Sequence, residues 1–462
     1  MTARMNSPRR PGRLEFGSRA CLVASLLITV CVTSPSSVVG AEPWTLERAV
    51  NTALKNSPDA RLARQRIEAA QALTDQAGAA WMPQVGLRGG YSETNSPMMA
   101  FGSILNQRAF NFGLDFNHPG QIDNLNATGT VAYNLYSGGR ATAGRNAAQA
   151  GARAAEQDLR TTQNQLGVEV VKAYLNIRKA REAVGAVAAG AKAYEAGVAA
   201  ARARFDAGQM LKADLLSLEV QFAQTRETLS SVRHGAALAE RAFFFVLGQE
   251  APVEPVELAA DDPTVARLDV PATDDYSQRP ELLGLHERIR AAEAMVRAAR
   301  GGRQPTVNAF ASYAYDQGWK LDSHGESWMT GVSVDLNVFD GGQTSGKIRQ
   351  STAELAQVKE MLRKASLGVG LEVEQARLAH EDAVERLAVT AQAVAQAEES
   401  AALSRARFEK GALLTADLIG VESRLIETRM RRAVAVADER IALAELRRAL
   451  GLAPLGQPNL EM

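Results

Sequence analysis

Residues 341–347 read Gly-Gly-Gln-Thr-Ser-Gly-Lys, which is close to the spacing of a phosphate-binding loop. In such a loop, backbone N–H groups and a Lys hold the phosphates, and a following Ser or Thr binds Mg²⁺. Here the following residue is Ile348, and a second copy of the segment has Ala143 and Gly144 at the last two positions. We therefore interpret these residues as a strand-to-helix turn.

The other side chains that could bind a metal or catalyse a reaction are isolated in the sequence. His380 falls on an apolar heptad position, where a packed histidine is expected, and Met98 and Met99 alone do not make a soft-metal site. Five His without clustered ligand spacing argue against a structural metal site. No Ser-His-Asp set and no carboxylate pair converge by spacing, so we predict no enzyme activity, no cofactor and no bound metal.

Two further acidic residues, Asp214 and Asp417, lie in a sequence motif that occurs twice. Residues 203–216 read ARFDAGQMLKADLL and residues 406–419 read ARFEKGALLTADLI. The Gly of each copy suits a left-handed residue just past a helix, and the Asp suits the first turn of the next helix, where N–H groups are free. Thr415 is a plausible N-cap for the second copy. We predict two helical hairpins with tips at residues 205–214 and 408–417.

The tips belong to an internal duplication of the chain. Residues 58–91 align with residues 280–313, and YNLYSGGR, which starts at Tyr133, aligns with LNVFDGGQ, which starts at Leu336. The expected organisation is a first repeat at 42–250, a linker or equatorial segment at 251–278, a second repeat at 279–451 and a C-terminal tail at 452–462. An insertion at about 93–126 distinguishes the first repeat from the second.

Each repeat is predicted to contain one very long helix. In the first repeat, apolar and small residues recur every seven positions from about Arg140 to Phe205, and the second repeat has the same pattern. Such a heptad repeat indicates packed, supercoiled helices. The helices expected at about 58–80 and 213–247 together match the long one in length, so we expect them to stack end to end beside it.

Four segments alternate apolar and polar side chains as strands do: residues 84–92, 127–136, 305–316 and 328–339. Strands of about ten residues fit a transmembrane barrel with a wet lumen, although a sheet on a soluble core gives the same alternation. Aromatic residues stand near the segment ends, as at a membrane interface: Trp81, Tyr136, Trp319, Trp328 and Phe339. Four strands cannot close a barrel in lipid, so several chains must share one, and three chains give twelve strands and a channel.

Residues 1–41 have the pattern of a secretory signal peptide. Five Arg precede an apolar run at 20–32, and Val39-Gly40-Ala41 follows as a small-residue cleavage site. Both cysteines, Cys21 and Cys31, lie in this segment, so disulfides are not expected elsewhere. Without its five Arg and one Glu, 47 basic and 51 acidic residues remain, a net charge of −4. This balance argues against a nucleic-acid partner.

The two half-repeats, the turns SGGR and DGGQ and the tip pattern RF-x-x-G-x-x-x-x-x-D resemble the TolC-type outer membrane efflux proteins, over nearly the whole chain after residue 41. The resemblance implies an α+β membrane protein. A homotrimer would combine four transmembrane strands per chain into a 12-stranded barrel above a long α-helical coiled-coil periplasmic tunnel. The turns, at Gly138, Gly139, Gly341 and Gly342, would join barrel to tunnel.

The same resemblance implies a function and partners. Such proteins are exit ducts of tripartite efflux or secretion systems, with a periplasmic adaptor (membrane fusion) protein and an inner-membrane pump of RND, ABC or MFS type. They lie in outer membrane lipid and export drugs, metals or proteins. From the residues alone, a secreted or surface coiled-coil scaffold or adhesin with a soluble β head remains the alternative.

The resemblance also assigns roles at the hairpin tips. Asp214, Asp417, Phe205 and Phe408 are implied at the periplasmic entrance, and the adaptor is expected to dock on the tips: Gly208, Leu211, Gly411 and Leu414. Enterobacterial members have a second aspartate where this chain has Gly420. They also have a tyrosine at the position of Phe408, hydrogen-bonded to the aspartate that matches Asp214. Phe408 cannot make that bond, so the closed entrance here must be held differently.

Overall fold

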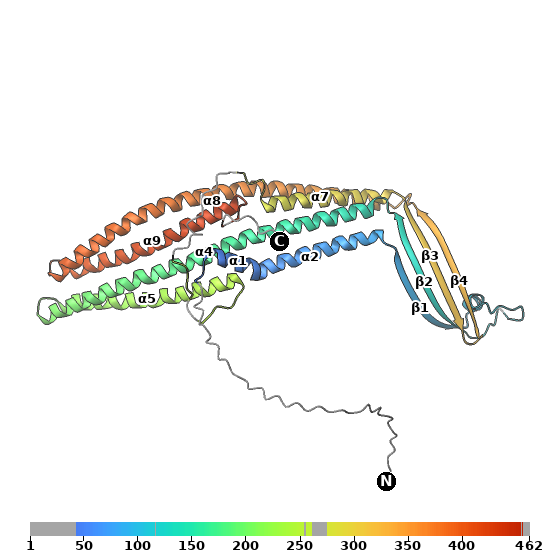
Figure 1. Cartoon of the computed structure of the whole chain (residues 1–462), viewed down its shortest axis with the longest axis horizontal. Coiled ribbons are helices and arrows are strands. Elements are labelled where there is room, and N and C mark those ends of the chain that lie inside the picture. The colour runs from blue at the N-terminus through green and yellow to red at the C-terminus, as the bar shows by residue number, and fades with distance from the viewer. Residues whose placement is uncertain (1–42, 116, 254–255, 261–274, 454, 456–462) are drawn as a thin grey trace, which may run out of the picture. The chain divides into compact units, whose positions relative to one another are not determined.

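A computed structural model describes residues 43–115, 117–253, 256–260, 275–453 and 455. The predicted signal peptide, most of the linker and nearly all of the tail lie outside these residues. The chain from Pro43 onward forms one compact unit, with a helical part and a four-stranded sheet at one end (Figure 1). Within the described residues, no helix is both long and apolar enough to cross a bilayer.

Two helices of 67 residues each run the length of the helical part: α4 (Arg140–Asp206) and α8 (Gln343–Glu409). At 1.5 Å per residue, each spans about 100 Å. Both fold back at the end far from the sheet, α4 into α5 (Lys212–Leu247) and α8 into α9 (Thr415–Ala449) (Figure 1). The long helices and the hairpins predicted from the heptads are confirmed.

Two further helices, α2 (Pro58–Gly78) and α7 (Pro280–Arg300), continue α5 and α9 towards the sheet. The joints depend on glycine. Gly248 ends α5 with φ 69°, and a Cβ there would lie 2.8 Å from the carbonyl oxygen of Asn56, just before α2. Gly451 follows α9 with φ 80°, and a Cβ there would lie 2.9 Å from the side chain of Arg279, the N-cap of α7. The expected end-to-end stacking is therefore confirmed.

A helix that the periodicity did not predict, α1 (Leu46–Asn56), packs against the middle of α4 and the C-terminal end of α5. Next to it, the Tyr174 hydroxyl of α4 donates to the carbonyl of Trp44 at 3.1 Å. The backbone of Trp44 also exchanges hydrogen bonds with Glu257 and Ala259, which belong to the described part of the linker. The linker thus contacts the helical part about halfway along its length.

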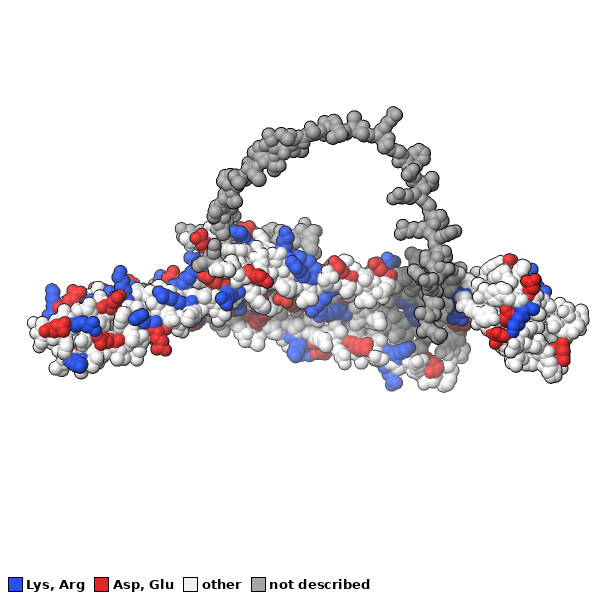
Figure 2. All heavy atoms as spheres, turned by 90° about the horizontal axis from the view of Figure 1, so that it is seen from below, with Lys and Arg blue, Asp and Glu red and all other residues white. Residues whose placement is uncertain are grey.

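The sheet is antiparallel in the order β1 (Gln84–Thr94), β2 (Ile122–Tyr136), β3 (Thr306–Gly318), β4 (Ser323–Asp335). Its register aligns the apolar residues of all four strands on one face, for example Val85 with Val131 and Val131 with Ala311. The large side chains of this face are exposed, including Leu87 at 90% and Trp328 at 76%. Figure 2 shows mainly uncharged surface at the sheet and interspersed charges along the helices.

Two predicted strand ranges were wrong. The ladder between β3 and β4 begins at Ser323 and ends at Asp335, instead of covering 328–339. β2 begins at Ile122 instead of residue 127. The alternation rule missed residues 323–327 because they carry no apolar side chain, whereas ladder hydrogen bonds come from the backbone; residues 336–339 alternate but lie outside the ladder. The insertion contributes the extension of β2 and a helix, α3 (Pro97–Asn106), which carries the exposed Met98 and Met99.

Candidate functional site at the hairpin tips

The two hairpin tips have the same backbone geometry. Gly208 (φ 72°) and Gly411 (φ 76°) are both left-handed, as predicted. Their N–H groups donate to the carbonyls of Phe205 and Phe408, each at 2.9 Å. The following N–H groups, of Gln209 and Ala412, donate to the carbonyls of Arg204 and Arg407, each at 2.8 Å. These bonds satisfy the last carbonyls of the helix. The matched sequences therefore encode matched helix ends.

The two tip aspartates begin the returning helices. Asp214 and Asp417 lie in the first turns of α5 and α9, where the helix dipole stabilises a negative charge. Asp214 is half-buried and Asp417 is exposed. Within the described part of the protomer, neither carboxylate forms an ion pair. The N-cap of α9 is Leu414 and not Thr415, so the predicted cap was wrong: Thr415 is the first helical residue and is buried.

The equivalent phenylalanines have different environments. Phe408 is 2% exposed and packs with Tyr194, Leu215 and Leu418, whereas Phe205 is 36% exposed. Arg204 lies over the Phe408 ring, with 5.7 Å from Cζ to the ring centroid, and donates to the Phe408 carbonyl at 3.3 Å. Phe408 therefore joins the second tip to the first through apolar packing and through the hydrogen bond from the Arg204 side chain to its carbonyl.

A duplicated ion pair lies just above each tip, and the sequence reasoning missed it. Arg202 of α4 pairs with Glu219 of α5 at 2.6 Å, and Arg405 of α8 pairs with Glu422 of α9 through two contacts. The hydrogen bond with Glu422 raises the pKa of Arg405 above its ordinary value. Both pairs occupy matched positions of the duplication, so extending the tip alignment by a few residues would have found them.

Tyr194, which the sequence analysis did not single out, joins the two hairpins. Its hydroxyl, on α4, donates to the carbonyl of Ile419 on α9 at 3.0 Å. The Ser423 hydroxyl lies 2.8 Å from the same oxygen and donates to it, because the single Tyr194 proton is already used. Burial raises the pKa of Tyr194, which keeps the hydroxyl protonated.

The turns between sheet and helices use paired left-handed glycines. Gly138, Gly139, Gly341 and Gly342 have φ between 65° and 89°. A Cβ on Gly138 would lie 2.5 Å from the carbonyl oxygen of Gly301, so larger residues cannot fit at that position. The segment with phosphate-loop spacing is the second of these turns, and Lys347 lies inside α8. Its interpretation as a strand-to-helix turn is confirmed.

The five predicted interface aromatics are exposed, from 43% for Trp81 to 87% for Phe339. Trp81 and Tyr136 lie at the helical end of the sheet and Trp319 in the β3–β4 turn. Two placements differ from expectation. Trp328 lies within β4, opposite Tyr313, and Phe339 lies beyond the end of β4.

Proteins of known family share this arrangement of helices, sheet and hairpin tips. The family described as outer membrane efflux protein matches residues 49–249 and 276–452. The chain is 24% identical over 327 residues to the outer membrane efflux protein BepC of Brucella suis, covering 67% of this chain and 68% of BepC. It is 23% identical over 439 residues to the outer membrane protein TolC of Vibrio cholerae, covering 92% and 94%.

The fold also matches solved structures. The CmeC outer membrane channel of Campylobacter jejuni superposes with a TM-score of 0.75 at 14% sequence identity, covering 90% of this chain and 87% of CmeC. These matches favour the outer-membrane interpretation over a scaffold with a soluble β head. Because the family match covers both repeats, the chain belongs to the outer membrane efflux protein family.

Proposed function

We propose that this protein is the outer-membrane exit duct of a tripartite efflux or secretion system and conducts substrates passively. One observation carries the proposal: a four-stranded sheet with an exposed apolar face stands at the end of helices about 100 Å long. The apolar face suits lipid and the opposite, polar face suits a wet lumen, where Asn134 donates to Asn308 at 2.9 Å. The helices would form the periplasmic tunnel.

The protomer supports assembly into a homotrimer. β1 and β4 are the edges of the sheet, and unpaired edges are not tolerated in lipid. Three copies would give twelve strands, enough to close a barrel around a channel. The helical part also has an incompletely covered side. Within the described protomer α8 has five buried residues, whereas α4, a helix of the same length, has 21. Apolar side chains on the outer helices are free to pack against neighbouring copies, among them Leu238, Phe245, Leu367 and Leu371.

In the trimer, the hairpin tips would surround the periplasmic entrance. Three copies each of Asp214 and Asp417 would make a negatively charged opening that favours cations. Leu211 and Leu414, at matched N-cap positions, are 72% and 73% exposed and present an apolar surface at the tips. This surface is our proposed docking site for a periplasmic adaptor, which would connect the duct to an inner-membrane pump of RND, ABC or MFS type.

Cell fractionation tests the proposal. The full-length protein should sediment with outer membranes and migrate as a trimer that dissociates on heating. Replacing Val85 and Val332, which lie on the apolar face of β1 and β4, by Asp should abolish membrane insertion. Replacing Thr130 and Ser312, which face each other on the polar side, by Asp should preserve it. Recovery of the wild type as a soluble protein would contradict the proposal and favour the coiled-coil scaffold.

A further inference from the structure

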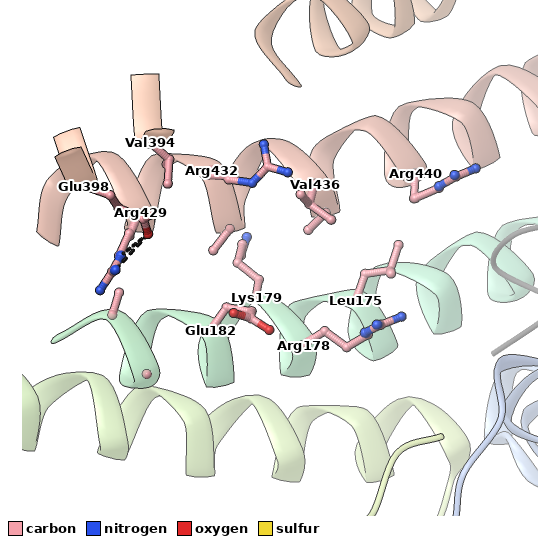
Figure 3. A pocket seen from close by; sticks show the side chains of 14 residues that line it. Leu175, Arg178, Lys179, Glu182, Val394, Glu398, Arg429, Arg432, Val436 and Arg440 are labelled. Atoms are coloured by element: carbon pink, nitrogen blue, oxygen red, sulfur yellow. Dashed lines mark hydrogen bonds and ion pairs between the residues drawn. The ribbon is translucent and has the colours of Figure 1, made fainter. Parts of the chain in front are cut away.

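A cationic cavity of about 580 Å³ lies between α4 and α9 (Figure 3). Its walls come from both repeats, with α4 on one side and α9 and α8 on the other. Five basic side chains line it, against two acidic ones: Arg178, Lys179, Arg429, Arg432 and Arg440, with Glu182 and Glu398. This excess of positive charge contrasts with the net negative charge of the chain after residue 41.

Among the described residues, three of these five cations have no acidic partner. Arg429 is neutralised by Glu398 at 2.7 Å and Arg440 by Glu439 at 3.0 Å, whereas Arg178 donates to the carbonyl of Ala260 and forms no ion pair with a described residue. The Nη1 atom of Arg432 is buried, and no acceptor among the described residues lies within hydrogen-bonding distance. Lys179 reaches from α4 towards α9 and has no ion-pair partner in the described part of the chain (Figure 3). A buried guanidinium nitrogen without an acceptor is costly unless a ligand supplies one.

The position of the cavity restricts the ligand. Arg178 is 38 residues from the start of α4, which corresponds to roughly 55 Å along the helix from the sheet. A lipid headgroup at the membrane surface cannot reach so far. The ligand must therefore be a soluble anion that is small enough for the cavity and carries at least two charges, to face cations on both walls.

We propose that this cavity binds a multivalent oxyanion of the phosphate type, held by Arg432 and Arg178 with Lys179 as the third donor. Guanidinium groups bind such oxygens through paired, charge-assisted hydrogen bonds. Because Arg432 belongs to α9 and the other two residues to α4, the bound anion links the two repeats at this level. Binding consequently stabilises the packing of one hairpin on the other.

Calorimetric titration of the full-length, detergent-purified protein with pyrophosphate tests the proposal. We expect one saturable site per chain, and a higher thermal unfolding midpoint when pyrophosphate is present. Arg432→Gln and Lys179→Gln should each weaken binding at least about tenfold, since each removes a charged hydrogen-bond donor. Acetate, with a single charge, should bind far more weakly than pyrophosphate.

Arg431→Gln is the matched control. Arg431 neighbours Arg432 on α9, but it is 70% exposed, pairs with Glu427 and does not line the cavity. Its replacement should leave binding unchanged. The proposal is overturned if pyrophosphate does not bind saturably, if both cavity variants bind it like the wild type, or if Arg431→Gln weakens binding as much as they do. The two variants lie on different helices, so a folding defect in one leaves the other as a test.

Discussion

The hydroxyl of Tyr194 and the carbonyl of Ile419 form a hydrogen bond of 3.0 Å that joins the first hairpin to the second. The two residues are 225 positions apart, and Tyr194 is fully packed, with 1% of its surface exposed. In this chain Phe408 has no hydroxyl with which to bind the Asp214 position. Tyr194 supplies an alternative bond between the hairpins near the tips.

Tyr194→Phe should therefore loosen the contact between the hairpins. The change removes two hydrogen bonds per chain, each worth about 1 kcal/mol. Single-channel recordings should show a higher open probability or conductance than in the wild type. Tyr174→Phe is the control, because it removes a hydroxyl of the same helix that bonds to Trp44 and not to α9. Equal behaviour of the two variants would exclude Tyr194 as a specific link.

The two tip ion pairs should differ in their importance. Arg405→Met leaves Glu422, which is 1% exposed, without its partner, and should cost about 2 kcal/mol of stability. Arg202→Met leaves Glu219, which is 32% exposed, and should cost less than about 1 kcal/mol. Chemical denaturation and limited proteolysis at the tips measure the difference. Equal costs would show that burial does not set the strength of these pairs.

The tip aspartates should control ion selectivity. Asp214→Asn and Asp417→Asn should each lower the preference for cations in planar-bilayer recordings, and the double variant should lower it further, since fixed charges in a narrow opening are weakly screened. Glu360→Gln makes the same change of charge at an exposed site on α8, paired with Arg363 and far from the tips. It should leave selectivity unchanged. Wild-type selectivity in the double variant would remove both aspartates from the entrance.

The left-handed tip glycines should be needed for docking and not for assembly. Gly208→Val and Gly411→Val force a β-branched residue into a left-handed backbone, at a cost of about 1–2 kcal/mol each. The tips should be reoriented while the distant sheet still forms trimers in the outer membrane. Export and cross-linking to the adaptor should fall. The control is Gly420→Val, because Gly420 lies in the interior of α9 and has open space for a side chain. Normal export by the double tip variant would contradict the docking proposal.

An ion-pair network near the linker should make stability depend on pH. Burial raises the pKa of Glu372, but hydrogen bonds from Arg448 and Arg279 outweigh burial and hold it below its ordinary value. The stabilisation is therefore complete above the ordinary Glu pKa of about 4.3 and is lost as the pH falls through the lower, folded-state pKa. Glu372→Gln should lower the thermal midpoint at neutral pH, and its difference from the wild type should shrink in acid. Glu360→Gln should show no such pH-dependent difference.

The sequence by itself determined the features that depend on local patterns. Heptads specified α4 to within one residue of its ends and indicated a matching helix in the second repeat, and the repeated glycines specified left-handed helix ends at Gly208 and Gly411. The alternation in the strands specified which side chains share a face. These properties follow from backbone geometry and side-chain periodicity over a few residues, which neighbouring elements do not change.

Only the tertiary structure decided which neighbour each repeated residue meets. Phe205 and Phe408 occupy the same position of the duplication, but Phe408 is buried and Phe205 is partly exposed. The reason is that the Phe408 ring packs against Tyr194 and Leu215 of the first hairpin, whereas Phe205 does not belong to that apolar cluster. Likewise, no local pattern brings Tyr194 to Ile419, or Lys179 and Arg432 into one cavity, because these contacts join segments more than 200 residues apart.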